Sequence, residues 1–350
     1  MDDVGHDRCT GAVRSFCAGS DLATVRDGAT LTVRRGAAVL ATFPLTVDAG
    51  GTPLLDAVGL ADPAWPEALL AALETLFVTT PALERVRLTL VPGSRAERAC
   101  LEAGLAVPAQ DGLSVPAELF WQHGELWLAR PRRTSFPQMH IVRDGRRHPL
   151  RPPQPRGPVY ARFIPWLGQV LSFRAVDPQQ DLDRFHRWMN DPRVDRIWSE
   201  AGDLDTHRAY LDHLMADPHM LPLIGSFDDR PFGYFELYWA KENRLGPHYD
   251  AHDYDRGWHV LVGEDAFRGR PWVSAWLPSL MHYMFLDDPR TQRIVGEPAA
   301  SHAQQIRNLD RSGFAKVKHV AFPHKRALLV TLGRERFFAD RLWAPGHAGG

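Results

Sequence analysis

The stretch from residue 254 to residue 286, YDRGWHVLVGEDAFRGRPWVSAWLPSLMHYMFL, decides the fold class of this chain. Its apolar run at 258–262 predicts a β-strand that carries one histidine, His259. A polar turn follows, and apolar residues at helical spacing then predict a helix that starts near Pro271. The expected order is therefore a strand, an arginine-containing loop and a helix N-terminus.

The loop between the expected strand and helix has the chemistry of an anion site. A helix N-terminus presents unpaired N–H groups and the positive end of its dipole. Arg268 and Arg270 add guanidinium groups that suit phosphate oxygens. The pattern predicts a phosphorylated cofactor across this loop. The alternative is a surface loop whose two arginines pair with Glu264 and Asp265.

The composition of the chain limits the number of domains, the kinds of partner and the location that can be expected. The chain has 350 residues, of which 44% are hydrophobic, enough for one large or two ordinary domains. Lys plus Arg number 41 and Asp plus Glu 42, so the net charge of -1 favours neither nucleic acid nor a membrane surface as partner. The 3 cysteines lack metal-ligand spacing, and no signal pattern or bilayer-length apolar run occurs. These features predict a cytoplasmic protein.

A sequence pattern in the first part of the chain recurs in the last part. A hairpin over 30–47 and a helix over 66–77 are expected there, then a strand over 85–91 and a helix capped by Ser94. Residues 83–105 (LERVRLTLVPGSRAERACLEAGL) share their order of strand, proline, helix and glycine with residues 291–314 (TQRIVGEPAASHAQQIRNLDRSGF). This weak repeat predicts two related α/β units, with chance recurrence as the alternative. The first unit shows no counterpart of the histidine strand and arginine loop, which predicts a degenerate, non-catalytic copy.

Prolines separate the two expected units. Seven prolines and many arginines at 131–158 exclude a long helix or a central strand, so this segment is the predicted linker. We therefore expect an N-terminal α/β unit over 1–130 and a catalytic unit over 159–350. Further elements are expected in the second unit at 171–175, 181–190, 206–215, 221–227, 231–239, 293–295 and 302–309, followed by a final hairpin.

That order of elements, strand, two helices, antiparallel strands, arginine loop and helix, matches the GNAT acyltransferase fold. Three stretches also resemble the siderophore-biosynthesis branch of that family: FELYWAKENRLGPHYDAHDYDRGWHVLVGEDAFRGR (235–270), LMHYMFLDDPRTQRIVGEP (280–298) and FPHKRALLV (322–330). The resemblance spans about 159–338. It implies a mixed, mostly antiparallel sheet flanked by helices. It also implies an acetyl-CoA or other acyl-CoA donor, a hydroxylated lysine-type acceptor and no metal.

The chemistry of acyl transfer to nitrogen agrees with the resemblance. It needs a neutral amine, a group that takes its proton and a site for oxyanion charge. With a pKa near its ordinary value, His259 is the expected base; the alternative is a structural core histidine. Some relatives carry an aspartate directly after a Glu-Pro pair, but Ala299 stands there in this chain. Glu297 is therefore the candidate acidic partner, with a plain strand-end residue as the alternative.

The expected cofactor contacts lie on the strand after His259 and around the arginine loop. Pro271 and Val273 depart from the family loop, which carries small residues there, and Pro271 removes one phosphate-binding amide. The expected contacts are Val260, Leu261, Val262, Arg268, Gly269, Arg270, Trp272, Val273 and Ser274.

The polar loop at 240–255 supplies most of the candidate acceptor residues, because an amino acid head group needs both a cation and an anion as partners. Each of them has a solvated loop position as its alternative. The candidates are Trp239, Lys241, Arg244, His248, Tyr249, Asp253 and Asp255. His324 and Lys325 either border the acceptor or sit on a turn. The spacing of His252, Asp253, Asp255 and His259 fits no closed zinc site.

The sequence thus predicts an N-acyltransferase that makes the hydroxamate of a siderophore from a hydroxylated lysine-type amine. The alternatives are acylation of hydroxyornithine, hydroxycadaverine or an unhydroxylated amine, and a catalytically silent CoA-binding module. Association with pathway enzymes or with a second copy stays open.

Overall fold

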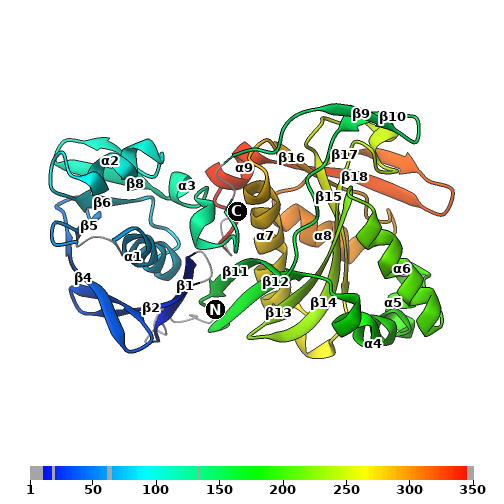
Figure 1. The fold of residues 1–350 in the computed structure, drawn as a ribbon, viewed down its shortest axis with the longest axis horizontal. Coiled ribbons are helices and arrows are strands. Elements are labelled where there is room, and N and C mark those ends of the chain that lie inside the picture. Colours follow the sequence, from blue (N-terminus) through cyan, green and yellow to red (C-terminus); the bar gives the residue numbers. More distant parts are fainter. Residues whose placement is uncertain (1–10, 18–19, 61–64, 132–133, 345–350) are drawn as a thin grey trace. The chain divides into compact units, whose positions relative to one another are not determined.

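The computed structural model describes residues 11–17, 20–60, 65–131 and 134–344 (Figure 1). The chain divides into two compact units. The first comprises Met1–Pro131 with Arg162–Val170, and the second comprises Arg132–Ala161 with Leu171–Gly350. Cys9 lies outside the described residues, and Cys100 is a buried free thiol.

The second unit is built on a mixed sheet with strand order β11-β12-β13-β14-β15-β16-β18-β17. Neighbours from β12 to β15 run antiparallel, as do β16, β18 and β17, whereas β15 and β16 run parallel. The strands are β11 Pro158–Ile164, β12 Gln169–Ala175, β13 Met220–Phe227, β14 Arg230–Trp239, β15 Arg256–Val262, β16 Arg293–Gly296, β17 Ala315–Ala321 and β18 Arg326–Gly333.

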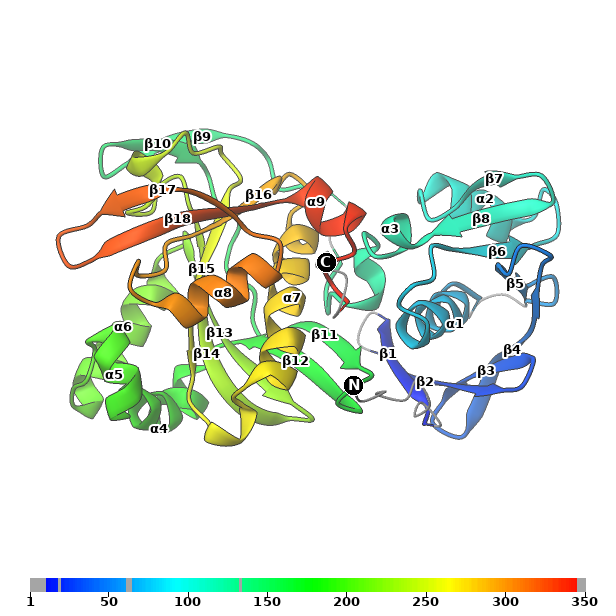
Figure 2. The ribbon, with the colours of Figure 1, turned by 180° about the vertical axis from the view of Figure 1, so that it is seen from behind.

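Helices cover both faces of this sheet because β14 alternates its apolar side chains (Figure 2). Tyr234 belongs to the core cluster formed with α4, α5 and α6. Phe235 points the other way and contacts Trp276 of α7, with ring centroids 5.6 Å apart. The helices are α4 Pro178–Met189, α5 Pro192–Trp198, α6 Leu204–Ala216, α7 Arg270–Asp287, α8 Ala303–Arg311 and α9 Arg334–Ala339.

The helix α5 is an element that the sequence analysis missed. Asp191 caps its first turn by accepting from the N–H of Arg193, and Pro192 follows at the helix start. The Asp-Pro pair is the signal that could have predicted it. The helix is short, but it contributes directly to the cavities described below.

The first unit repeats the strand order of the second, β1-β2-β3-β4-β5-β6-β8-β7. This confirms the internal repeat, with the helix α2 after β6 matching the helix α8 after β16 and Ser94 capping α2 as expected. The elements are β1 Val13–Cys17, β2 Ser20–Asp27, β3 Thr30–Arg35, β4 Ala38–Val47, β5 Pro53–Asp56, α1 Trp65–Thr79, β6 Arg85–Thr89, α2 Arg95–Glu102, β7 Val107–Ala109, β8 Gly112–Pro116 and α3 Ala117–Phe120.

One expectation about the first unit is wrong. It does contain a counterpart of β15, namely β5, which pairs in parallel with β6 as β15 does with β16. The sequence that follows β5, residues 57–64, contains no arginine. The two copies also differ in pairing, because the ladder of β5 and β6 continues past Asp56 to a bond from the N–H of Ala57 to the carbonyl of Thr89 (2.9 Å).

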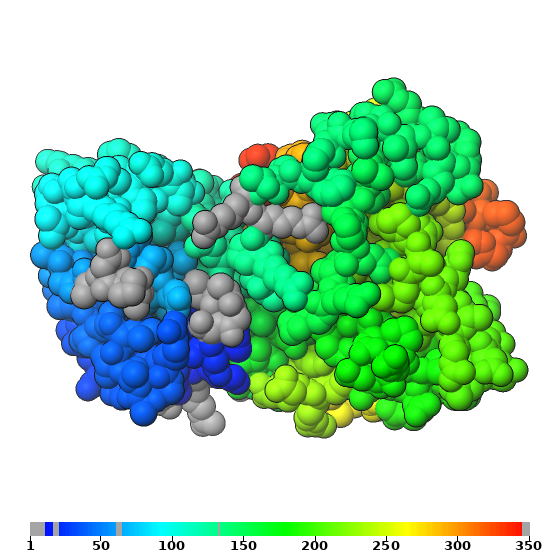
Figure 3. All heavy atoms as spheres, viewed as in Figure 1, coloured from blue at the N-terminus to red at the C-terminus, as the bar shows by residue number. Residues whose placement is uncertain are grey.

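The segment 134–158 differs from the plain linker that its prolines predicted. It forms a hairpin of β9 (His140–Arg143) and β10 (Arg146–Pro149), visible at the surface of the second unit in Figure 3. Arg151 then binds both carboxylate oxygens of Glu242, at 2.6 Å each, and donates to the carbonyl of Asp253. The prolines fall mainly outside the hairpin ladder, so they do not prevent this folding.

Candidate active site

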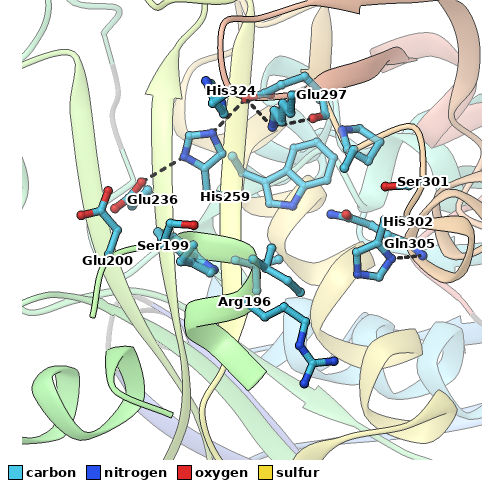
Figure 4. Close-up of a pocket in the computed structure, with 18 of the residues that line it drawn as sticks. Arg196, Ser199, Glu200, Glu236, His259, Glu297, Ser301, His302, Gln305 and His324 are labelled. Carbon is cyan, nitrogen blue, oxygen red and sulfur yellow. Dashed lines mark hydrogen bonds and ion pairs between the residues drawn. The ribbon is translucent and has the colours of Figure 1, made fainter. Parts of the chain in front are cut away.

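His259 lies between two carboxylates (Figure 4). Its Nδ1 is 3.0 Å from Glu236 Oε2, and its Nε2 is 3.1 Å from Glu297 Oε1. Both carboxylates are buried, whereas 23% of the histidine side chain is exposed. The ring is therefore the part of this cluster that solvent and substrates can reach.

The sheet register places these three side chains together. Glu236 on β14 stands directly opposite His259 on β15, so the two share one face of the sheet. Along their described residues, β15 and β16 pair at Arg256–Ile294 and Gly257–Val295 and no further. Glu297 follows the last residue of β16, beyond this last pair, so it reaches His259 across the point where the strands separate.

Glu236 is a site residue that sequence reasoning missed as such. It lies on the expected strand at 231–239, on the same face as Tyr234 and Tyr238, and was not among the predicted site residues. The signal was a lone carboxylate in a strand that is otherwise apolar and buried. Its partner could be found only from the strand register, which a single sequence does not fix.

The two carboxylates change the acid–base state of the histidine. Burial lowers the pKa of His259, but Glu297 and Glu236 outweigh that effect and raise the pKa to about 9. The expectation of a pKa near the ordinary value is therefore wrong. Burial acts to raise the pKa of Glu297, but His259, Lys325 and Tyr238 together hold it well below its usual range.

A second layer of donors fixes both carboxylates. Tyr210 and Tyr234 donate their hydroxyls to Glu236 Oε1, at 2.6 and 3.0 Å. Tyr238 donates to Glu297 Oε2 at 2.8 Å. A Cβ on Gly257 would lie 2.3 Å from the Tyr238 ring, so the absence of a side chain there lets the tyrosine cross the neighbouring strand.

The histidine opens onto a cavity of about 950 Å³, called the large cavity below. One wall comes from the end of α5 and the residues after it, including Trp198 and Glu200, and another from β16 and the start of α8. Arg244, His324 and Lys325 line it at the Glu297 side, where Arg244 is 3.2 Å and Lys325 3.8 Å from Glu297 Oε1. A small polar molecule can therefore reach the Glu–His–Glu cluster from this side.

A second cavity of about 380 Å³, called the adjoining groove, shares part of its lining with the large cavity. The shared side chains include Trp198, Val260 and Gln305. The groove runs along β15 to the N-terminus of α7, where Gly269 has a φ of 97°. Of the predicted cofactor residues, it is lined by Val260, Leu261, Val262, Arg268, Gly269 and Val273.

Three predicted cofactor residues do not line the groove. Trp272 packs against Phe227 and Phe267, with ring centroids 4.8 Å from each. Ser274 donates to the carbonyl of Pro271 within the helix. Arg270 is exposed at the first turn of α7, whereas Arg268 crosses back to donate to the carbonyl of Val262 at 2.7 Å.

Most of the predicted acceptor residues do not line the large cavity; Arg244 does. Lys241 pairs with Asp253 at 2.7 Å, and Asp253 also binds His140. These charges are used to hold the loop and the β9–β10 hairpin together.

The remaining predicted acceptor residues also make contacts that stabilise the fold. Asp255 is buried and accepts from Tyr249 and Arg293. His248 packs on Phe322, and Trp239 is covered by Arg151 and Arg256. The sequence of the loop at 240–255 shows which residues are charged, but it does not show which of these charges pair with one another.

Two further observations concern only the residues that the structure describes. No cluster of three or more His, Cys, Asp or Glu side chains among them has the arrangement of a metal site. None of the helices in the described ranges combines the length and apolarity that crossing a membrane requires.

Comparison with known proteins agrees with this geometry. Residues 177–322 match the family model described as an acetyltransferase (GNAT) domain. N(6)-hydroxylysine O-acetyltransferase of Escherichia coli is 40% identical over 275 residues, covering 78% of this chain and 85% of that protein. A fungal relative, the N(5)-hydroxyornithine:cis-anhydromevalonyl coenzyme A-N(5)-transacylase of Beauveria bassiana, is 50% identical over 195 residues, covering 55% of this chain and 43% of its own length.

A solved structure shows the same fold. An uncharacterised protein from Bacillus halodurans superimposes with a TM-score of 0.50 at 29% identity, covering 53% of this chain and 94% of its own. The strand separation after Gly257, the helix N-terminus beside it and these relatives lead to one assignment. The chain belongs to the siderophore-biosynthesis branch of the GNAT acyltransferases, whose named members include hydroxylysine and hydroxyornithine acyltransferases.

Proposed function

We propose that this protein transfers an acyl group from coenzyme A to the hydroxylamine nitrogen of an N-hydroxylated lysine-type amine. The observation that carries the proposal is that the two cavities share Val260, the residue next to His259, in their lining. One offers a helix N-terminus for a phosphorylated donor, and the other offers a polar chamber for an acceptor. The product is a hydroxamate, a group suited to binding ferric iron.

The donor is an acyl-CoA in the adjoining groove. Beyond Gly257 the backbone of β15 is not paired with β16, so its N–H groups are free of that neighbour and can polarise a thioester carbonyl. Arg268 and the first amides of α7 meet the pyrophosphate. Pro271 supplies no amide, so the arginine side chain carries more of this contact.

Arg268 is expected to matter for donor binding more than Arg270 does. Arg268→Ala should raise the Kd for CoA roughly tenfold, the size of one lost charge-assisted hydrogen bond. Arg270→Ala is the matched control, because its side chain does not line the groove, and its Kd should stay within about twofold. Isothermal titration calorimetry with CoA measures both, and equal effects would remove the proposed phosphate contact.

The reaction moves one proton. The neutral hydroxylamine nitrogen attacks the thioester carbonyl, the C–N bond forms, the C–S bond breaks and the nitrogen proton ends on the thiolate. His259 in its neutral form takes that proton and passes one to sulfur, with Glu236 and Glu297 stabilising the charged ring. With a pKa of about 9, about one molecule in a hundred carries the neutral ring at pH 7.

This state of His259 gives a pH prediction. In the wild type, kcat/KM should rise with pH until about 9, because the neutral base becomes more abundant up to its pKa. Glu297→Gln removes one of the charges that raise this pKa, so its rising limb should shift to lower pH. Glu200→Gln is the control: Glu200 lines the same cavity but has no contact with His259 among the bonds described above. An unshifted limb in Glu297→Gln would show that another group is the base.

A donor and acceptor screen tests the function itself. The protein is incubated with acetyl-CoA and N6-hydroxylysine, N5-hydroxyornithine, N-hydroxycadaverine or lysine, and free thiol is followed. We expect thiol release with hydroxylated amines and a product that forms the coloured ferric complex of a hydroxamate. A product without that colour would place the acyl group on oxygen, as the name of the Escherichia coli relative states. CoA binding without thiol release would identify a silent module.

A further inference from the structure

The Glu297 side of the large cavity carries a surplus of positive charge. Glu297 Oε1 has His259 at 3.1 Å, Arg244 at 3.2 Å and Lys325 at 3.8 Å. Lys325 also donates to the backbone carbonyl of Glu297 at 2.9 Å, so its position is fixed by two contacts. Two cations, Arg244 and Lys325, and the His259 ring thus surround one carboxylate at the place where the acceptor nitrogen must react.

The second carboxylate lies on the other side of the ring, because Glu236 contacts Nδ1 of His259 and not Nε2. At the Glu297 side, Arg244 and Lys325 therefore face one carboxylate even when His259 is neutral. Glu236 already accepts from two tyrosine hydroxyls and from His259. Both carboxylates are buried behind their donors. At the Glu297 side an incoming group therefore meets N–H donors and positive charge, whereas the exposed carboxylate of the cavity, Glu200, belongs to the wall that follows α5.

These features treat two kinds of amine differently. A lysine-type amine is an ammonium ion near neutral pH, with three donors and no acceptor. It would bring a like charge beside Arg244 and Lys325. Its N–H groups would also face the N–H groups of these two residues, so that neither side could accept a hydrogen bond. A hydroxylamine is less basic, so it is neutral under the same conditions, and its oxygen can accept a hydrogen bond. The site therefore complements the hydroxylated amine in both charge and hydrogen bonding.

We propose that Arg244 and Lys325 are specificity-determining residues that select N-hydroxylated acceptors by excluding protonated amines from His259. The inference rests on the proposed function, since it concerns the acceptor of that same reaction. It differs from recognition of the distal end of the substrate, because Arg244 lies 3.3 Å from the ring Nε2 of His259. The selection therefore acts at the reacting nitrogen.

The test compares kcat/KM for N6-hydroxylysine and for lysine in the wild type and in Lys325→Met. Methionine keeps much of the side-chain length and removes the charge. The ratio of the two values should fall at least tenfold, mainly because lysine becomes a better substrate. Lys325→Arg keeps the charge and should retain the wild-type ratio. Arg244→Met should change the ratio in the same direction as Lys325→Met.

A binding measurement keeps the test decisive if Lys325→Met loses catalysis. Calorimetric titration of lysine into the CoA-loaded protein should show binding at least tenfold tighter in Lys325→Met than in the wild type. An unchanged ratio in active enzymes, or unchanged or weaker lysine binding, overturns the proposal. A wild type that releases no thiol with any hydroxylated amine overturns the proposed function instead, so the two failures are distinguishable.

Discussion

His259→Ala is expected to lower kcat roughly 10²- to 10⁴-fold, the usual contribution of one general acid–base group. The variant removes the imidazole that takes the proton in the proposed reaction and whose pKa is raised to about 9. It leaves the adjoining groove intact, because His259 does not line it. The Kd for CoA should therefore stay within a few-fold of the wild type.

The measurement is steady-state kinetics with the best acceptor from the screen, together with CoA titration. His319→Ala is the matched control, since His319 is an exposed histidine on β17 of the same unit. It should keep wild-type activity. Full activity in His259→Ala would mean that the substrate's own nitrogen loses its proton to water, and the proposed proton path would be wrong.

Arg151→Met is expected to destabilise the second unit by about 3–5 kcal/mol, as removing one partner of a buried ion pair does. Only 1% of the Arg151 side chain and 7% of the Glu242 side chain are exposed. The two groups share a pair of 2.6 Å bonds. Without the arginine, Glu242 would remain buried with only His148, at 3.5 Å, as an ion-pair partner among the described residues. Trp239 would also lose the guanidinium that lies 4.5 Å from its ring centroid.

Differential scanning calorimetry measures this effect, because two units can unfold in separate transitions and a single midpoint would mix them. Arg208→Met is the control: Arg208 pairs with Asp205 at 3.6 Å on the exposed face of α6. Its variant should leave the transition unmoved. If Arg151→Met behaves like this control, residues 134–158 add little to the stability of the second unit.

Local patterns in the sequence predicted a large part of the fold. The residue pattern at 231–239 predicted β14, and the cap at Ser94 predicted the start of α2. The repeat was visible because both copies keep strand, proline and helix in one order. These features depend on residues close together in the chain, where spacing is enough to infer geometry.

Charge pairing was the part that could not be predicted. Asp253 and Asp255 have the composition of a binding loop, yet the structure commits them to Lys241, His140 and Arg293. The raised pKa of His259 was not predicted either, because it also depends on contacts between residues that are far apart in the sequence. It depends on Glu297 and Glu236, which lie 38 and 23 residues away and become neighbours only in the folded sheet.

The duplicated strand order has a consequence for comparing the two units. Both copies retain the same order of eight strands among their described residues. In the first unit β5 and β6 stay hydrogen-bonded through Ala57, whereas β15 and β16 part after Gly257. The point at which the two parallel strands stop pairing is therefore a backbone feature in which the two copies differ, before any side chain is compared.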